Sequence, residues 1–404
     1  MRGKMRPRLF VRAEIMLLSV YTHPGGITME EKVLSQIKKL GFGLMRLPKN
    51  ADGSIDVEKT SQMVDMFLEA GCRYFDTAYV YDMGESEKAI KKALVDRYPR
   101  QDYFLATKLN AWMQCTDEES AKKQFYTSLE RTGAGYFDFY LLHALQGENF
   151  TKYDEYNLWE FVKELKEQGL VKHYGFSFHA GPDLLDKLLT EHPDVDFIQL
   201  QVNYADMDNP DVQSRANMEV ARKHNKPFVV MEPVKGGSLA NPVPEAMEVF
   251  RDFDPDASAA SWAIRFAASQ EGVLTVLSGM SNIEQMEDNL SYMKDFEPLS
   301  PAEKYAVERV RTIIGASKAI PCTACRYCEE GCPMQIPIPE IFSAYNLYLR
   351  DGRPIDEVRT EYSLVTTGTG VASACISCGQ CEAACPQQIG IIGLIAECAD
   401  KLEV

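Results

Sequence analysis

The 404-residue chain lacks any apolar run that approaches the roughly 18 residues of a membrane-spanning helix. It also lacks an excess of positive charge, because 43 Lys and Arg residues stand against 59 Asp and Glu residues, a formal net charge of −16 at pH 7. Such a chain repels nucleic acids and anionic membranes, so neither is expected as a partner. A content of 45% hydrophobic and 25% charged residues is typical of a globular protein with one large domain and a smaller one.

A complete targeting signal is missing at the amino terminus. Several arginines are followed by a short apolar run, Ile15 to Val20, and no A-x-A-like cleavage site comes after it. We therefore expect residues 1–28 to form a disordered N-terminal extension rather than a signal.

The chain also has no G-x-G-x-x-G turn after an early strand. Open, doubly wound sheets that bind dinucleotides typically carry this turn, so its absence argues against that fold. Instead, eight strand-like segments alternate with helical patterns from Leu40 onward. Alternation implies a parallel sheet, and eight units over about 250 residues is the usual length of a closed (β/α)8 TIM barrel, which we favour over the open sheet. The predicted strands span residues 41–47, 73–76, 103–109, 137–143, 171–177, 197–202, 228–231 and 273–277.

One intervening helix is predicted at Asp154–Gln168, where apolar residues recur at helical spacing and Gly169 supplies a C-cap. A second helix should begin near Glu85, directly after the segment YFDTAYVYDMG.

Polar side chains stand where three successive predicted strands end, namely Asp76, Lys108 and His143, and Tyr81 follows in the loop after Asp76. Each alone has an ordinary explanation, as a cap, a solvated charge or a core histidine. Together they would meet at one mouth of the barrel, where such enzymes carry out their chemistry. A nearby ammonium lowers the pKa of a phenol from about 10, so this group suits proton transfer to a carbonyl oxygen.

Residues 40–292 resemble the aldo/keto reductase superfamily in the segments LGFGLMRLP, FDTAYVYDMGESE, ATKLN, DFYLLHA, GFSFH and SGMSNIEQMEDNL. The resemblance implies a catalytic tetrad of Asp76, Tyr81, Lys108 and His143, with Tyr81 as the proton donor. It also implies a nicotinamide cofactor, NAD(H) or NADP(H), bound in extended form without a Rossmann fold.

By the same resemblance, Ser177 and Gln199 would hold the carboxamide of the nicotinamide. Two positions depart from the family pattern. Phe178 stands where Asn commonly follows the serine, and Met231 stands where an aromatic side chain commonly stacks on the nicotinamide.

The resemblance further places the cofactor's phosphates and adenosine among small and polar residues, namely Gly236, Gly237, Ser278, Gly279, Gln285 and Asn289. No Lys or Arg occurs between Ser278 and Met293, so a 2′-phosphate has no obvious partner there and Lys235 is the nearby candidate. NADH is therefore an alternative to NADPH.

Eight of the eleven cysteines form two C-x2-C-x2-C-x3-C-P runs: Cys322, Cys325, Cys328, Cys332 and Cys375, Cys378, Cys381, Cys385. This spacing is typical of two-cluster ferredoxins, in which the fourth cysteine of each run binds the other cluster. Zinc is the alternative, but a tetrahedral site uses paired C-x2-C arms and leaves the third and fourth cysteines without a role. We predict two [4Fe-4S] clusters in a reducing cytoplasm.

The crossed arrangement assigns one cluster to Cys322, Cys325, Cys328 and Cys385, and the other to Cys375, Cys378, Cys381 and Cys332. The long interval between the runs contains an amphipathic helical pattern, which favours a mainly helical ferredoxin-like domain over the compact βαββαβ form. We expect the barrel at 29–297 and a helical linker with the dicluster domain at 298–404.

The expected function is NAD(P)H-dependent reduction of a small aldehyde or ketone, in a pocket lined by Trp112, Met113, Asn203 and Tyr204. Nicotinamide carries two electrons and each cluster one, so a flavin or a redox partner such as a ferredoxin or flavoprotein could link the two halves. The alternative is a redox-sensing nicotinamide-binding module, or an electron-transfer subunit, with negligible carbonyl turnover.

Overall fold

Eight parallel strands close into a barrel in which each strand pairs with the next and the last pairs with the first. The computed structural model describes residues 33, 36–147, 149–316 and 319–403, so the expectation for residues 1–28 lies outside the described part. The predicted TIM barrel is confirmed, and its strands are β1 (Leu40–Gly43), β2 (Tyr74–Asp76), β3 (Phe104–Leu109), β4 (Phe137–Leu145), β5 (Val171–Phe178), β6 (Phe197–Gln201), β7 (Phe228–Met231) and β8 (Val273–Ser278).

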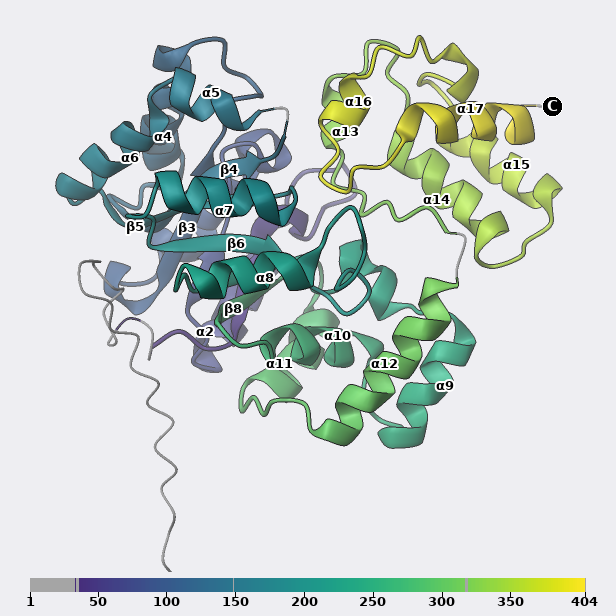
Figure 1. The fold of residues 1–404 in the computed structure, drawn as a ribbon, viewed down its shortest axis with the longest axis horizontal. Helices are drawn as coiled ribbons and strands as arrows, with labels where there is room; N and C mark the ends of the chain where they lie inside the picture. The colour runs from purple at the N-terminus through teal and green to yellow at the C-terminus, as the bar shows by residue number, and fades with distance from the viewer. Residues whose placement is uncertain (1–32, 34–35, 148, 317–318, 404) are drawn as a thin grey trace, which may run out of the picture.

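Helices surround the barrel (Figure 1). Their apolar side chains pack against the outside of the sheet and form the main core with it. They are α2 (Val57–Glu69), α3 (Glu85–Ile90), α4 (Glu118–Thr132), α5 (Phe150–Glu155), α6 (Leu158–Glu167), α7 (Pro182–Glu191), α8 (Ser214–Lys223), α9 (Pro244–Phe253), α10 (Ala259–Ala268) and α11 (Ile283–Met293). Short helical turns are η1 (Leu44–Arg46), η2 (Tyr81–Gly84), η3 (Lys91–Val95), η4 (Arg100–Asp102) and η5 (Lys235–Ala240).

Two sequence-based boundaries were wrong. The helix predicted at Asp154–Gln168 is two helices, α5 and α6, because Asn157 adopts a left-handed conformation with φ of 50° that an α-helix cannot continue through. The first strand ends at Gly43 rather than Leu47, since the chain turns there into η1.

Tight packing fixes the strands at one point in particular. A Cβ on Gly175 of β5 would overlap the carbonyl oxygen of Phe197 on β6, so only glycine allows the backbones to approach there. Phe139 and Leu141 of β4 belong to a second apolar cluster, distinct from the main core, which also contains Tyr74 of β2 and Leu277 of β8.

A helical unit follows the barrel. Helix α12 (Pro301–Gly315) packs against α9, and its buried Ala306, Val307 and Val310 join the core of the barrel. The cysteine domain, residues 319–403, then contains helices and no strand: α13 (Tyr327–Glu330), α14 (Ile338–Leu349), α15 (Ile355–Val365), η6 (Ala372–Ala374), α16 (Gln380–Ala383) and α17 (Ile391–Leu402). It has a core of its own. None of the helices described in either unit is long and apolar enough to cross a membrane.

The cysteine domain lies against the barrel, with α13 and α16 on the side that faces it (Figure 1). Hydrogen bonds from barrel residues and from both cysteine runs join the two units: Arg46 to the Thr323 carbonyl, Gln146 to the Ala383 carbonyl at 2.6 Å, Gln201 with Gln387 at 2.8 Å, and Gln388 to the His179 carbonyl at 3.3 Å. Because these barrel residues follow or end strands, the domain covers the carboxyl-end mouth of the barrel.

Candidate functional site

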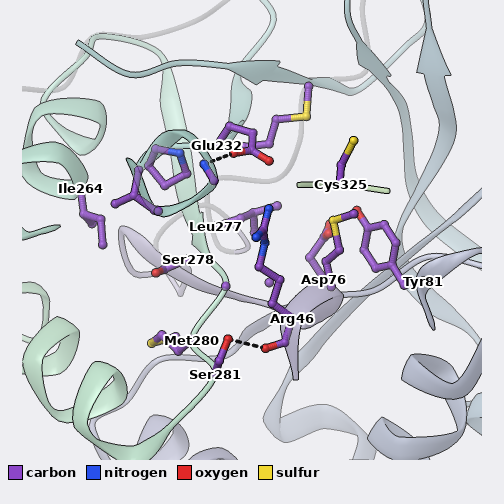
Figure 2. A pocket seen from close by; sticks show the side chains of 18 of the residues that line it. Arg46, Asp76, Tyr81, Glu232, Ile264, Leu277, Ser278, Met280, Ser281 and Cys325 are labelled. Atoms are coloured by element: carbon purple, nitrogen blue, oxygen red, sulfur yellow. Dashed lines mark hydrogen bonds between the residues drawn. The ribbon is translucent and has the colours of Figure 1, made fainter. Parts of the chain in front are cut away.

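A cavity of about 300 Å³ lies at that mouth, and all four predicted tetrad residues line it. Asp76 ends β2, Lys108 lies in β3, His143 lies in β4, and Tyr81 begins η2. Figure 2 shows Asp76 and Tyr81 on one side of the cavity and Ser278 with Met280 on the other.

Lys108 is the centre of the tetrad. Its ammonium donates to the Asp76 carboxylate, to the Thr77 carbonyl at 2.7 Å, and to the Tyr81 phenol oxygen at 3.3 Å. The lysine and the aspartate are almost fully buried, and a buried charge is tolerated only when it is paired and hydrogen-bonded in this way. The phenol oxygen of Tyr81 accepts the hydrogen bond from Lys108, so the phenol hydrogen remains available to an acceptor in the cavity.

Burial raises the pKa of Tyr81 well above its ordinary value of 10, and the negative charges of Asp76 and Glu232 add to the effect. This is opposite to the lowering that we expected from Lys108, because that expectation ignored loss of water around the phenol. Burial also lowers the pKa of Lys108, which Asp76 opposes. The tyrosine is therefore a neutral phenol, the form that can donate a proton.

His143 is a neutral imidazole at physiological pH. Burial, reinforced by the charge of Lys108, lowers its pKa well below 6.5, and its Nδ1 has no hydrogen-bond partner in the described part of the chain. Its ring lies 5.8 Å from that of Tyr81, centroid to centroid. It can thus orient a polar group beside the phenol without competing for the proton.

The two residues predicted to hold a carboxamide both line the cavity. The Oγ of Ser177 accepts a hydrogen bond from the Ala144 amide at 2.7 Å, which leaves its hydroxyl hydrogen free to donate. The Oε1 of Gln199 is buried and has no partner among the described residues. An unpaired buried acceptor is costly unless a ligand completes it, so the pair fits an amide group.

Sequence reasoning missed His179. Phe178 turns away from the cavity and packs against Phe176, whereas His179 lines it. Burial lowers the pKa of His179 to about 4, and its Nδ1 has no partner in the described structure. Alternation along β5 could have revealed it, because residues two apart point to the same face.

The far end of the cavity contains the residues predicted to lie near phosphate and adenosine: Ser278, Gly279, Gln285 and Asn289. Asn289 donates to the Ser278 hydroxyl at 2.7 Å and accepts from the Tyr292 hydroxyl at 2.5 Å. Both polar atoms of its amide are therefore engaged, and Asn289 holds Ser278 in place.

Gly236 and Gly237 also line the cavity, but their amides are engaged within the protein. Gly236 donates to the Glu232 carboxylate at 2.6 Å, and Gly237 donates to the Val234 carbonyl at 3.0 Å. A Cβ on Gly236 would lie 2.5 Å from the Thr323 Cα. The glycine thus lets the cysteine domain approach the barrel closely.

Positive charge reaches the cavity from an unexpected residue. Lys235 forms a buried ion pair with Asp206 and does not line the cavity, whereas Arg46 does. Arg46 extends between Glu232 and Ser281 in Figure 2. Its guanidinium donates to the Thr323 carbonyl, so it contacts both the cavity and the cysteine domain.

The predicted pocket residues Trp112, Met113, Asn203 and Tyr204 do not line the cavity. Tyr204 is fully buried and packs edge-on against Phe266, and the Asn203 side chain donates to Asp206 at 2.7 Å. The ring of Trp112 contacts that of His143, with centroids 6.3 Å apart.

The eight cysteines of the two runs group across the runs. Cys332 lines one small apolar pocket together with Cys375, Cys378 and Cys381. Charge on Cys385 acts on the thiols of Cys322, Cys325 and Cys328 and raises their pKa values, which burial raises more. Across the described residues, no three His, Cys, Asp or Glu side chains converge on a single-ion position. Four thiols in an apolar shell fit a polynuclear cluster.

The buried aspartate–lysine pair, the neutral phenol and the neutral imidazole lie at the mouth of a closed parallel barrel, where (β/α)8 enzymes carry their active sites, and together they suit proton transfer. The chain belongs to the aldo/keto reductase family, whose profile matches residues 39–311. A 4Fe-4S dicluster domain matches residues 321–389, so the predicted combination of a barrel and a ferredoxin-like domain is confirmed.

Related proteins match the barrel region. An aldo-keto reductase of Mycolicibacterium vanbaalenii is 30% identical over 251 residues, which cover 61% of this chain and 81% of the relative. The solved holo form of an aldo-keto reductase from Bacillus halodurans is 26% identical, with a TM-score of 0.56 over 68% of this chain and 92% of that one. An aldo/keto reductase from Klebsiella pneumoniae, solved with NADP and acetate, shares the fold at 18% identity and a TM-score of 0.56, over the same shares of the two chains.

Proposed function

We propose that this protein reduces an aldehyde or ketone with NADH or NADPH, and that Tyr81 donates the proton. The contact between the Lys108 ammonium and the Tyr81 phenol, inside a cavity that also contains His143, carries the proposal. Membership of the aldo/keto reductase family supports it.

When bound, the nicotinamide supplies a hydride to the carbonyl carbon. Tyr81 gives its phenol proton to the carbonyl oxygen, and the product is the alcohol. Lys108 stabilises the phenolate left behind, and Asp76 keeps Lys108 charged in its buried position. The unpaired Nδ1 of His143 orients the carbonyl or the polar group next to it. A proton from solvent then restores the phenol.

For the cofactor, we propose that the Ser177 hydroxyl and the Gln199 oxygen hold the carboxamide. The free hydrogen on Ser177 and the unpaired Oε1 of Gln199 support this assignment. The phosphates and adenosine would lie along the loop after β8, near Ser278, Gly279, Gln285 and Asn289, with Gly236 and Gly237 facing them. Arg46 is the cation best placed for a phosphate.

We also propose two [4Fe-4S] clusters with crossed ligation, which transfer electrons one at a time. The grouping of Cys332 with the second run and of Cys385 with the first supports it. Because hydride transfer moves two electrons, a flavin or a redox partner such as a ferredoxin is the expected link to the barrel.

A second candidate is a redox-sensing module that binds nicotinamide and turns over negligibly. Met231 in place of an aromatic side chain, and amides of Gly236 and Gly237 that are already engaged, favour it. A broad carbonyl panel under strict anaerobiosis separates the two candidates, because only the reductase consumes NADH or NADPH.

The decisive variant is Tyr81→Phe, which removes only the donor oxygen. We expect carbonyl turnover to fall by about 100-fold or more, the usual contribution of a positioned acid, while cofactor binding stays within about twofold. Tyr79→Phe, in the same loop but outside the cavity, is the matched control. Undiminished turnover in Tyr81→Phe would refute the assignment.

A further inference from the structure

One aromatic residue of the first cysteine run, Tyr327, lies beside the barrel's tetrad. Tyr327 stands between Cys325 and Cys328 in the sequence and begins α13. Arg326, just before it, adopts a left-handed conformation with φ of 67°, which redirects the chain. Tyr327 and Cys325 both line the cavity that contains Tyr81 and His143.

The ring of Tyr327 is held by aromatic contacts from the barrel. Its centroid lies 5.5 Å from that of Trp112 at an interplanar angle of 68°, and 6.2 Å from that of His143 at 84°. Both are edge-to-face arrangements, which are favourable for aromatic pairs. Tyr327 also packs against the apolar group of Ala78, Val80 and Tyr81. The ring is therefore fixed beside two tetrad members.

The cysteine domain supplies a roof to the cavity. Four of the lining residues come from it, namely Cys325, Tyr327, Pro386 and Gln387. Among these, Tyr327 has the largest side chain and is the one in ring contact with His143. A tyrosine has only two side-chain torsions, so a packed ring forms a rigid wall. Its removal would open space directly beside the reacting groups.

We propose that Tyr327 is a specificity-determining residue, through which the cluster-binding loop limits the width of the carbonyl compound accepted beside Tyr81 and His143. This inference rests on the proposed carbonyl reduction. The pocket accepts narrow aldehydes and excludes those with a bulky group next to the carbonyl. The wall stands between two proposed cluster ligands, so its position depends on the folded cysteine domain.

The test compares Tyr327→Ala and Tyr327→Phe in the full-length, anaerobically purified protein. Binding of propanal, cyclohexanecarbaldehyde and 1-adamantanecarbaldehyde is followed by tryptophan fluorescence. These aldehydes lack aromatic rings and do not mask the emission. Trp112 does not line the cavity, but its ring contacts those of Tyr327 and His143, which do, so its emission responds to changes at the wall. The other two tryptophans, Trp159 and Trp262, are buried in the barrel core. Oxidation of NADH or NADPH by the same aldehydes is measured in parallel.

In Tyr327→Ala we expect the preference for 1-adamantanecarbaldehyde over propanal to rise tenfold or more, in binding and in kcat/KM. Tyr327→Phe keeps the ring and should keep the wild-type preference. Tyr305→Ala is the control, because Tyr305 is an exposed tyrosine on α12, 64% accessible, outside the cavity. Iron content verifies the fold of each variant, and Tyr327→Leu replaces Tyr327→Ala if the latter loses iron.

An unchanged size preference in an iron-replete Tyr327→Ala or Tyr327→Leu variant would overturn the inference. Absence of binding by all three aldehydes, in the wild type and the variants, would overturn it as well. If only the proposed reductase function is wrong, no aldehyde will cause oxidation of the nicotinamide. The size preference in the binding titrations will still change in the Tyr327 variants.

Discussion

The barrel and the cysteine domain are built on opposite plans. In the barrel, eight strands hydrogen-bond to one another in a closed ring, and their ends bring Asp76, Lys108 and His143 to one mouth. Residues 319–403 form short helices around a small core, and their eight run cysteines lie near one another without bonding. The barrel's site is therefore held by its own hydrogen bonds, whereas the cysteine sites would be held together by the proposed clusters.

The thiols show the difference most clearly. Burial raises the pKa of Cys325 to about 12 and that of Cys381 to about 11, so both are protonated at neutral pH without metal. Cluster ligands must be thiolates, so cluster binding has to release these protons. In the barrel, by contrast, Lys108 and Asp76 already satisfy each other.

Removal of iron should produce the largest difference in stability between the two units. We expect chelation under anaerobic conditions to unfold the cysteine domain and leave the barrel folded, because only the former depends on metal for its ligand sets. Circular dichroism and limited proteolysis would show a protease-sensitive segment after residue 316 and a resistant barrel. Cooperative loss of both units would contradict the separation.

Cysteine variants test the number of clusters and their crossed ligation. With two cubes, the protein should contain roughly eight irons, and Cys332→Ser should perturb the cluster of the second run more than that of its own neighbours. Cys385→Ser should do the reverse. Electron paramagnetic resonance of the reduced proteins measures this, and Cys398→Ser, a buried thiol outside both runs, is the control. About four irons in the wild type would refute two cubes.

The buried ion pair tests preorganisation in the barrel. Lys108→Met leaves the Asp76 carboxylate buried without its partner, and such a loss costs about 3–5 kcal/mol of stability. We expect a large fall in the melting temperature, partly recovered in the double variant Asp76→Asn/Lys108→Met. A single variant as stable as the wild type would show that the pair is not needed for the fold.

The contact between the two units gives a moderate effect. In Gly236→Ala, a new Cβ meets the Thr323 backbone, so the domain must shift away from the barrel mouth. We expect faster proteolysis between the units. Gly135→Ala is the matched control, since it has a similarly positive φ of 76° but nothing within 4 Å of the added carbon. Equal proteolysis of the two variants would argue against close docking.

The smallest effect concerns His179 and pH. Its folded pKa of about 4 lies below the ordinary 6.5, so the unfolded chain binds more protons between these values and stability falls as pH drops from 6.5 to 4. We expect the melting temperature of His179→Asn to decline by a few degrees less than that of the wild type across this window. Parallel declines would show that His179 is not held neutral by burial.

The sequence by itself determined the features that depend on local pattern and spacing. The period of apolar residues and the absence of the glycine fingerprint led to the barrel, which the structure confirms. Asp76, Lys108 and His143 were predicted to lie together because each stands at the end of a strand, and the carboxyl ends of parallel barrel strands lie at one mouth. The spacing of the cysteines led to the dicluster domain.

Only the tertiary structure decided what meets at the barrel mouth. Residues about 280 positions apart, such as Arg46 and Thr323, touch there, and no local pattern encodes such a contact. The same holds for Tyr327 beside His143 and for the close approach that makes Gly236 necessary. The direction of the Tyr81 pKa shift also needed the fold, because desolvation depends on every segment that covers the phenol, including the cysteine domain.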